Sequence, residues 1–191
     1  KEQVRNMESH RQVTRAKRQD NPVPVVAIVG YTNAGKSTLL NTLTAANVLE
    51  EDKLFATLDP TTRNYKLPNG QEVLLTDTVG FIRKLPHHLI DAFRSTLEEA
   101  KYSDIIIHVV DCSNPSMDKN VHAVYETLKN LEVKDKIIIT VFNKIDKVEE
   151  KPVLRDFNAD YTVSAAIKKN IGLNEINDAI EVALKSMRVM V

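Results

Sequence analysis

The sequence predicts an α/β domain whose mostly parallel, six-stranded sheet is flanked by helices. Three observations predict this fold class. Short apolar runs alternate with longer stretches that repeat apolar residues at helical spacing, which is typical of a parallel sheet covered by helices. An extended segment with Pro-Asn-Gly at its centre indicates a hairpin and hence one antiparallel edge strand. The 191 residues, 42% hydrophobic and 27% charged, suffice for one such domain with a real core.

Composition excludes several classes of protein. The single cysteine, Cys112, rules out an internal disulfide and fits a reducing cytoplasm. No apolar run reaches the ~18 residues that a membrane-spanning helix needs. The net charge is zero, because 26 Lys and Arg balance 26 Asp and Glu.

The first 20 residues differ from the rest of the chain. They hold six Lys or Arg against three acidic residues, and they contain no Gly or Pro. We expect a helical extension over residues 1–21, the tail of a preceding domain, and the main domain over 22–191, because the prolines of Asn21–Pro24 interrupt helices. The chain starts without Met, which indicates a piece of a longer protein. Three arginines on one helical face would neutralise RNA phosphates or form a solvated or docking face: Arg11, Arg15 and Arg18.

Five apolar runs are predicted strands, and a sixth strand precedes the Pro-Asn-Gly turn within residues 64–76. The five runs are Val25–Val29, Glu72–Thr76, Ile105–Val110, Lys136–Phe142 and Tyr161–Val163. Apolar residues at helical spacing form three faces that we expect to pack on the sheet. These faces are Leu89, Phe93, Leu97 and Ala100; Val121, Val124, Leu128 and Leu131; and Leu173, Ile176, Ile180, Ala183 and Met187.

The segment GYTNAGKS, Gly30 to Ser37, follows the first strand and precedes a helical stretch. Strand, glycine loop and helix start in this order are the context that a phosphate-binding loop requires. Gly30 and Gly35 let the backbone approach phosphate oxygens, and the helix start adds N–H donors. Lys36 would bridge the β- and γ-phosphates, and the Ser37 hydroxyl would bind Mg²⁺. The alternative is a glycine-rich turn formed by chance.

Two further motifs follow predicted strands. DTVG, Asp77 to Gly80, places a carboxylate where Mg²⁺ is held through its water shell and a glycine N–H where a γ-phosphate is sensed. NKID, Asn143 to Asp146, selects a base, because its carboxylate accepts the ring N–H and the amino group of guanine. Adenine has neither donor in that place. Asn143 would brace the phosphate loop, and Lys144 would lie along the base.

A fourth motif, VSAA at Val163 to Ala166, follows the last strand, and the Ala165 N–H suits the guanine carbonyl oxygen. The carboxyl ends of strands in an open α/β sheet meet at one crevice. The four motifs therefore predict a P-loop NTPase of the Ras-like GTPase kind, since a kinase-like interpretation leaves NKID unexplained. The segment FATLDPTTR stands where a first switch is needed, with three threonines that are candidates to hold Mg²⁺: Thr57, Thr61 and Thr62.

Read together, these segments resemble the GTPase domain of the HflX family over residues 21–187. The residues that carry the resemblance are GYTNAGKST, FATLDPTTR, DTVGFIRKLPHHLIDAFRSTLEE and NKID. The resemblance implies a cytoplasmic GTP-binding protein that associates with the large ribosomal subunit and acts in ribosome splitting or rescue under stress. It points to Thr57 as the switch threonine, and it makes residues 1–20 the tail of the family's N-terminal part.

Phe81 follows Gly80 where Ras-like GTPases carry a water-orienting glutamine. Phenylalanine has no group that positions water, so we expect slow intrinsic hydrolysis that needs help from elsewhere. One source of help is K⁺ bound by Asn33, which occupies the position that resembles the potassium ligand of cation-activated GTPases. The other source is a partner, most simply the ribosome. Hydrogen bonding within the loop is the plainer interpretation of Asn33.

The predicted activity is Mg²⁺-dependent hydrolysis of GTP to GDP and phosphate by a monomer. The catalytic candidates are Lys36, Thr57, Gly80 and Asn33, and the metal ligands are Ser37, Thr57 and Asp77. The nucleotide-binding candidates are Gly30, Tyr31, Thr32, Asn33, Ala34, Gly35, Lys36, Ser37, Thr38, Phe55, Thr57, Asp77, Gly80, Asn143, Lys144, Asp146, Ser164, Ala165 and Ala166. The alternatives are a GTPase of RNA modification or ribosome assembly, and a nucleotide-dependent binding module with negligible turnover.

Overall fold

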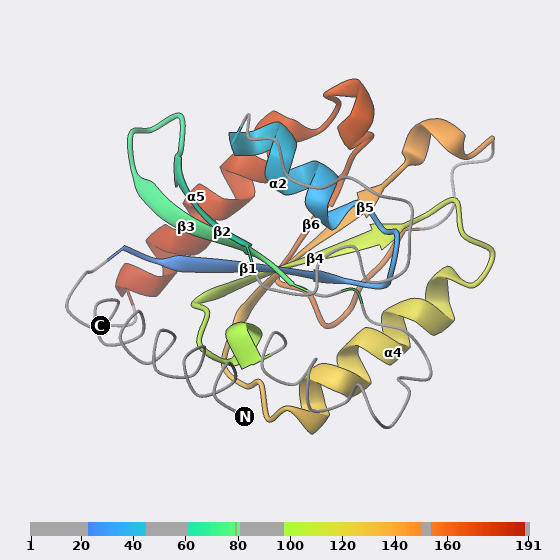
Figure 1. The fold of residues 1–191 in the computed structure, drawn as a ribbon, viewed down its shortest axis with the longest axis horizontal. Helices are drawn as coiled ribbons and strands as arrows, with labels where there is room; N and C mark the ends of the chain where they lie inside the picture. Colours follow the sequence, from blue (N-terminus) through green and yellow to red (C-terminus); the bar gives the residue numbers. More distant parts are fainter. Residues whose placement is uncertain (1–22, 45–60, 79, 81–97, 150–153, 190–191) are drawn as a thin grey trace, which may run out of the picture.

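A computed structural model describes residues 23–44, 61–78, 80, 98–149 and 154–189 (Figure 1). Over these ranges the chain forms a six-stranded sheet with helices on both faces. The strands are β1 (Val25–Gly30), β2 (Thr61–Lys66), β3 (Glu72–Asp77), β4 (Ile105–Asp111), β5 (Ile137–Asn143) and β6 (Tyr161–Ser164). The helices are α2 (Lys36–Thr44), α4 (Met117–Asn130) and α5 (Leu173–Val189). The predicted extension over 1–21, Phe55, Thr57, Phe81 and the helical positions Leu89, Phe93 and Leu97 lie outside the described residues.

The predicted mixed sheet is confirmed, with the strand order β2-β3-β1-β4-β5-β6. β2 runs antiparallel to β3, and every other neighbouring pair is parallel. The hairpin between β2 and β3 turns at the predicted Pro-Asn-Gly, where Gly70 has a φ of +88° and its N–H donates to the Leu67 carbonyl at 2.8 Å. A left-handed backbone is a conformation that glycine adopts without strain.

Side chains that alternate along the strands pack into two separate hydrophobic cores, one on each face of the sheet. On β1, Val26 and Ile28 join the core under α2 and α5, whereas Ala27 and Val29 join the core under α4. Figure 1 shows the same division, with α2 and α5 on one face of the sheet and α4 on the other. Because both faces are covered, the strands are apolar almost throughout, as expected for parallel strands.

The five strands that run parallel to one another end at the same edge of the sheet. Each runs one residue beyond the apolar run that the sequence shows, and each extra residue is a glycine or is polar: Gly30, Asp77, Asp111, Asn143 and Ser164. The motifs GYTNAGKS, DTVG, NKID and VSAA therefore lie at this edge of the sheet. Within the described ranges, no helix combines the length and the apolar character that a membrane span requires.

A buried polar cluster lies between the sheet and α4. Asp156 accepts hydrogen bonds from the hydroxyls of Tyr125 and Thr140, each at 2.6 Å, and its carboxylate lies 3.9 Å from Nδ1 of His108. The His108 ring packs edge to face on Tyr125 with ring centroids 5.2 Å apart. Burial lowers the pKa of His108 from 6.5 to about 4, although the Asp156 carboxylate opposes the shift. His108 is therefore a buried residue of β4 whose nearest described carboxylate is that of Asp156.

This cluster makes the stability of the chain depend on pH. Between pH 6.5 and about pH 4 the unfolded chain binds a proton at His108 that the folded chain does not bind. The free energy of unfolding should therefore fall as the pH drops through this window, by about 3 kcal/mol in total from this residue. Urea unfolding of the wild type and His108→Gln at a series of pH values measures the effect, because the variant should lose that part of the slope. His122→Gln, an exposed histidine of α4, is the control, and parallel curves for wild type and His108→Gln would contradict the prediction.

Candidate active site

The phosphate loop joins β1 to α2 and is packed so closely that two of its positions accept only glycine. A Cβ on Gly30 would lie 2.5 Å from the Val109 carbonyl oxygen of the neighbouring strand. Gly35 has a φ of +109°, and a Cβ there would collide with the side-chain amide of Asn143. The tight fit leaves the backbone amides of the loop and of the first turn of α2 as the groups that can line a cradle for an anion.

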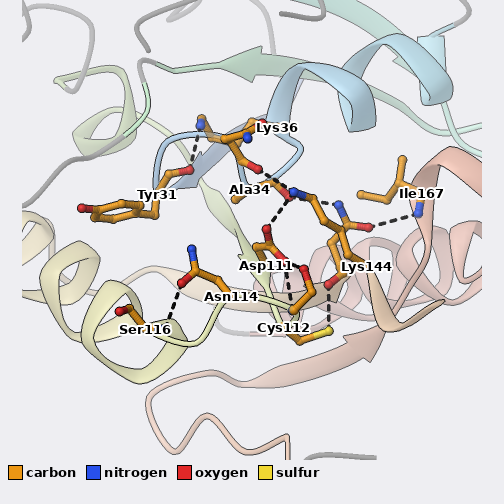
Figure 2. A network of polar contacts seen from close by, with 12 residues as sticks. Tyr31, Ala34, Lys36, Asp111, Cys112, Asn114, Ser116, Lys144 and Ile167 are labelled. Carbon is orange, nitrogen blue, oxygen red and sulfur yellow. Dashed lines mark hydrogen bonds and ion pairs between the residues drawn. The ribbon is translucent and has the colours of Figure 1, made fainter. Parts of the chain in front are cut away.

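Lys36 begins α2 and is buried, with only 7% of its surface exposed. Its ammonium donates to the Tyr31 carbonyl at 3.3 Å, so the side chain folds back over its own loop (Figure 2). Burial lowers the pKa of Lys36, and the nearby Asp77 carboxylate offsets part of that effect. Gly80 lies against the same loop, because a Cβ there would come within 2.9 Å of Thr32 Cα and 3.1 Å of Lys36 Nζ. A buried cation beside glycines is a site for a large anion.

Ser37 and Asp77, the two described metal-ligand candidates, are in direct contact. The Ser37 hydroxyl donates to Oδ2 of Asp77 at 2.7 Å, and Asp77 is fully buried at the end of β3. The third metal candidate, Thr57, lies outside the described residues, whereas Thr61 and Thr62 belong to strand β2. The Thr62 hydroxyl shares a hydrogen bond with that of Thr76 across the hairpin at 3.0 Å.

Asn143, the first residue of NKID, connects two loops. Its side-chain amide donates to the Ala34 carbonyl in the phosphate loop at 3.0 Å, and its side-chain oxygen accepts the Ile167 N–H beyond β6 at 3.1 Å. Asn143 is 4% exposed and stands at the carboxyl end of β5. The bond to Ala34 ties the end of β5 to the loop between β1 and α2.

Lys144 crosses from β5 to the phosphate loop and to β4. Its ammonium donates to the Asn33 carbonyl at 2.9 Å. It also donates to Oδ2 of Asp111 at 2.7 Å, a contact that Figure 2 shows. The other Asp111 oxygen accepts the Ser113 N–H at 3.0 Å and the Ser113 hydroxyl at 2.6 Å. Asp111 was not among the predicted site residues, although its position one residue past an apolar run matches that of Asp77. Asn33 has a φ of +65°, so its main chain is turned toward Lys144 in a left-handed conformation.

The final two motifs lie side by side in successive short turns. Asp146 belongs to the turn Ile145–Lys147 after β5, and the Ile145 N–H donates to the Ala165 carbonyl after β6 at 3.2 Å. The Ala165 N–H, predicted for the guanine oxygen, donates to the Phe142 carbonyl at 2.8 Å. A guanine oxygen would have to share or replace this bond. Ser164 ends β6, and the Ala166 N–H donates to the Ile171 carbonyl at 3.1 Å.

The comparisons with known proteins agree with this arrangement. A family model described as a 50S ribosome-binding GTPase matches residues 25–144. Proteins described as GTPase HflX are 61% identical over 189 residues in Lacrimispora saccharolytica, 54% over 180 residues in Caldanaerobacter subterraneus and 43% over 147 residues in Escherichia coli. The chain belongs to the HflX family of GTPases. The three alignments cover 99%, 94% and 77% of the chain and 45%, 41% and 34% of those relatives. The HflX-family chain thus spans less than half the length of these relatives.

Solved structures place this HflX-family chain in the P-loop GTPase fold. A GTP-binding protein from Sulfolobus solfataricus in complex with GDP superposes with a TM-score of 0.73 at 27% identity, over 95% of this chain and 58% of the other. Era in complex with MgGDPNP and nucleotides of 16S ribosomal RNA superposes with a TM-score of 0.65 at 28% identity, over 83% and 55% of the two chains. The predicted fold class is therefore confirmed.

The residues of this HflX-family chain fit a guanine nucleotide and Mg²⁺. The loop excludes side chains where phosphate oxygens would approach, and the adjacent buried ammonium of Lys36 would be neutralised by them. Among the described residues, no group of three or more His, Cys, Asp and Glu side chains is placed to hold a metal. Mg²⁺ takes few protein ligands when phosphates supply the others, so the Ser37–Asp77 pair suits it.

Asp111 should matter for nucleotide binding because it holds Lys144 against the phosphate loop. In Asp111→Asn the charge-assisted bond to Lys144 is lost, and we expect the affinity for GDP to fall about tenfold. Isothermal titration of the wild type and the variant with GDP measures the change. The double variant Asp111→Asn, Lys144→Met should bind GDP no worse than Lys144→Met alone, since both changes break the same contact. Unchanged binding by Asp111→Asn would contradict this role.

Proposed function

We propose that the chain binds GTP with Mg²⁺ and hydrolyses it to GDP and phosphate. The observation that carries the proposal is the convergence of four motifs at one edge of the sheet, where Asn143 and Lys144 each make a hydrogen bond to the phosphate loop. The side chains proposed to stabilise charge (Lys36), to hold the metal (Ser37) and to lie along the base (Lys144) thus surround one loop. The GDP complex of the Sulfolobus solfataricus protein, which has the same fold, supports the assignment.

Each residue has a separate part in the proposed hydrolysis. Lys36 and the loop amides stabilise the negative charge that develops as water attacks the γ-phosphate in line with the leaving oxygen. Asp77 orients the Ser37 hydroxyl, and the Asp146 carboxylate selects guanine by accepting hydrogen bonds from the two N–H donors of the base. Mg²⁺, when bound, neutralises charge on the β- and γ-phosphates. Thr57 completes the metal site, and Gly80 senses the γ-phosphate. The turnover is slow, because Phe81 replaces a water-orienting residue.

We further propose that the large ribosomal subunit is the partner and that the whole protein acts in ribosome splitting or rescue. The description of the matching family as a 50S ribosome-binding GTPase supports this partner. We propose a cytoplasmic location and a monomeric state as well. A role in RNA modification or ribosome assembly is the second candidate, and the RNA fragment bound to Era, a protein of the same fold, favours it.

The residue proposed to bind K⁺, Asn33, lies in the loop segment that faces Lys144. Its carbonyl oxygen accepts from the Lys144 ammonium, and its φ of +65° is held by the surrounding loop. A potassium ion bound by the Asn33 side chain would supply positive charge near the leaving phosphate. Asn33→Ala should then remove any stimulation by K⁺ while GDP binding persists.

The proposed function is tested by GTP turnover of the purified chain in Na⁺ and in K⁺ buffers, with and without large ribosomal subunits. Lys36→Met is the blank, and ATP is the test of base selectivity. Stimulation by subunits supports the ribosomal partner, and stimulation by K⁺ that Asn33→Ala abolishes supports the cation site. GDP binding without turnover under every condition would overturn hydrolysis by this chain and leave a nucleotide-dependent binding module.

A further inference from the structure

The carboxylate proposed to select guanine already has a partner within the chain. Nζ of Lys169 lies 3.1 Å from Oδ2 of Asp146. The two residues belong to successive short turns, Ile145–Lys147 after β5 and Ile167–Lys169 after β6. The Asp146 side chain is 22% exposed and the Lys169 side chain is 60% exposed, so the lysine reaches the carboxylate from the solvent side.

The main chain on both sides of this ion pair is fixed, whereas the lysine side chain is not. The Ile145 N–H donates to the Ala165 carbonyl at 3.2 Å, which ties the Asp146 turn to the end of β6. The Lys169 N–H donates to the Ala166 carbonyl at 2.9 Å, and Asn170 ends its turn in a left-handed conformation. A long, mostly exposed ammonium side chain can therefore leave without any change of backbone.

The chemistry of the base makes Lys169 a competitor. Guanine presents two adjacent N–H donors, so it uses both oxygens of the carboxylate, one for each donor. Hypoxanthine lacks the 2-amino group and uses one oxygen. Guanine therefore competes with Lys169 for the oxygen that the lysine contacts, while hypoxanthine can bind through the other oxygen and leave the ion pair in place. The hydrogen bond from the same lysine lowers the pKa of Asp146.

We propose that Lys169 is a specificity-tuning residue of the base site, which occupies one oxygen of Asp146 and has to release it when the 2-amino group of guanine binds. The inference rests on the proposed function, since it concerns the same site. The ion pair lowers the affinity of the chain for guanine nucleotides. It also favours dissociation of the base, because the ion pair re-forms as the base departs. An exposed ion pair is worth a modest amount, so it adjusts binding and does not block it.

The test compares the wild type with Lys169→Met, which keeps the length of the side chain and removes its charge. Titration with GDP should show binding tighter by about two- to fivefold, the range expected for an exposed ion pair. Titration with inosine diphosphate should show no change, because hypoxanthine does not need the oxygen that Lys169 holds. Lys168→Met is the matched control: the neighbouring lysine is also exposed, and it should leave both affinities unaltered.

The salt dependence of GDP affinity is a second measurement, and a merely structural role of Lys169 would not change it. The difference in GDP affinity between the wild type and Lys169→Met should shrink as salt rises from about 0.05 M to about 0.5 M, because salt screens an exposed ion pair. Unchanged or weaker GDP binding by Lys169→Met would overturn the inference, as would an equal gain for GDP and inosine diphosphate. A folded wild type that binds neither nucleotide would instead overturn the proposed function.

Discussion

Replacing Lys36 with methionine is expected to lower the rate of GTP hydrolysis by roughly 100- to 1,000-fold, the loss typical of removing one preorganised charge-stabilising group. Lys36 is a buried cation of the phosphate loop, and within the described ranges its ammonium donates to the Tyr31 carbonyl at 3.3 Å. A phosphate would be a far stronger partner. Single-turnover hydrolysis by the wild type and by Lys36→Met at saturating GTP measures the loss.

The same variant should keep most of its stability in the absence of nucleotide. Burial already disfavours the charged form of Lys36, so a neutral side chain of similar length removes a desolvation cost. We expect the free energy of unfolding in urea to fall by no more than about 1 kcal/mol. This combination separates a functional role from a structural one. Lost activity that is accompanied by a large loss of stability would show that Lys36 mainly supports the fold.

Changing Asp146 to asparagine is expected to weaken GDP binding roughly 100-fold or more. A site that recognises a base by hydrogen bonds loses much of its affinity when a donor of that base is left without an acceptor. Asparagine offers one acceptor and one donor where the carboxylate offers two acceptors. Its amide N–H₂ would face the 2-amino group of guanine. Xanthine carries a carbonyl oxygen in that place, so the variant should bind xanthosine diphosphate better than the wild type does. Competition titrations with the two nucleotides measure the exchange of preference.

A matched control for Asp146→Asn is Asp178→Asn, which makes the same chemical change at an exposed position of α5. It should leave both nucleotide affinities unchanged. Weaker GDP binding by Asp146→Asn without any gain for xanthosine diphosphate would mean that the variant has disturbed the turn and not the reading of the base. The prediction of base selection by Asp146 would then be wrong.

The strands show how far sequence reasoning reaches and where it stops. Apolar runs predicted the described strands, because burial on both faces leaves a clear signal, and the Pro-Asn-Gly turn predicted one antiparallel edge strand, whereas the order of the strands was not predicted. Each parallel strand was nonetheless predicted one residue too short at its carboxyl end, as with β4, which continues to Asp111. Ladder hydrogen bonds belong to the main chain and continue past the last apolar side chain. The residue missed at the end of each parallel strand is the glycine or polar residue that stands at the edge of the candidate site.

Contacts between segments that are distant in the chain could not be predicted from the sequence. Motif spacing identified Asp146 and Lys144, but it did not indicate that Lys169 and Asp111 are their partners, since these pairs are 23 and 33 residues apart and follow no known pattern. His108 gave the same difficulty. Its place in an apolar strand predicted burial, whereas its approach to Asp156 depends on how the segment after β5 returns to the sheet.

The two hydrogen bonds of Asn143 have a thermodynamic consequence. Its side chain bonds to Ala34 in the loop proposed to hold the phosphates. It also bonds to Ile167, in the turn Ile167–Lys169 that follows β6 near the proposed base site. Ordering either half of the site therefore helps to order the other half. Guanosine and pyrophosphate, offered as two separate half-ligands, should bind cooperatively, and each should strengthen the other by the same factor. Asn143 is in this sense a coupling element between recognition of the base and recognition of the phosphate chain.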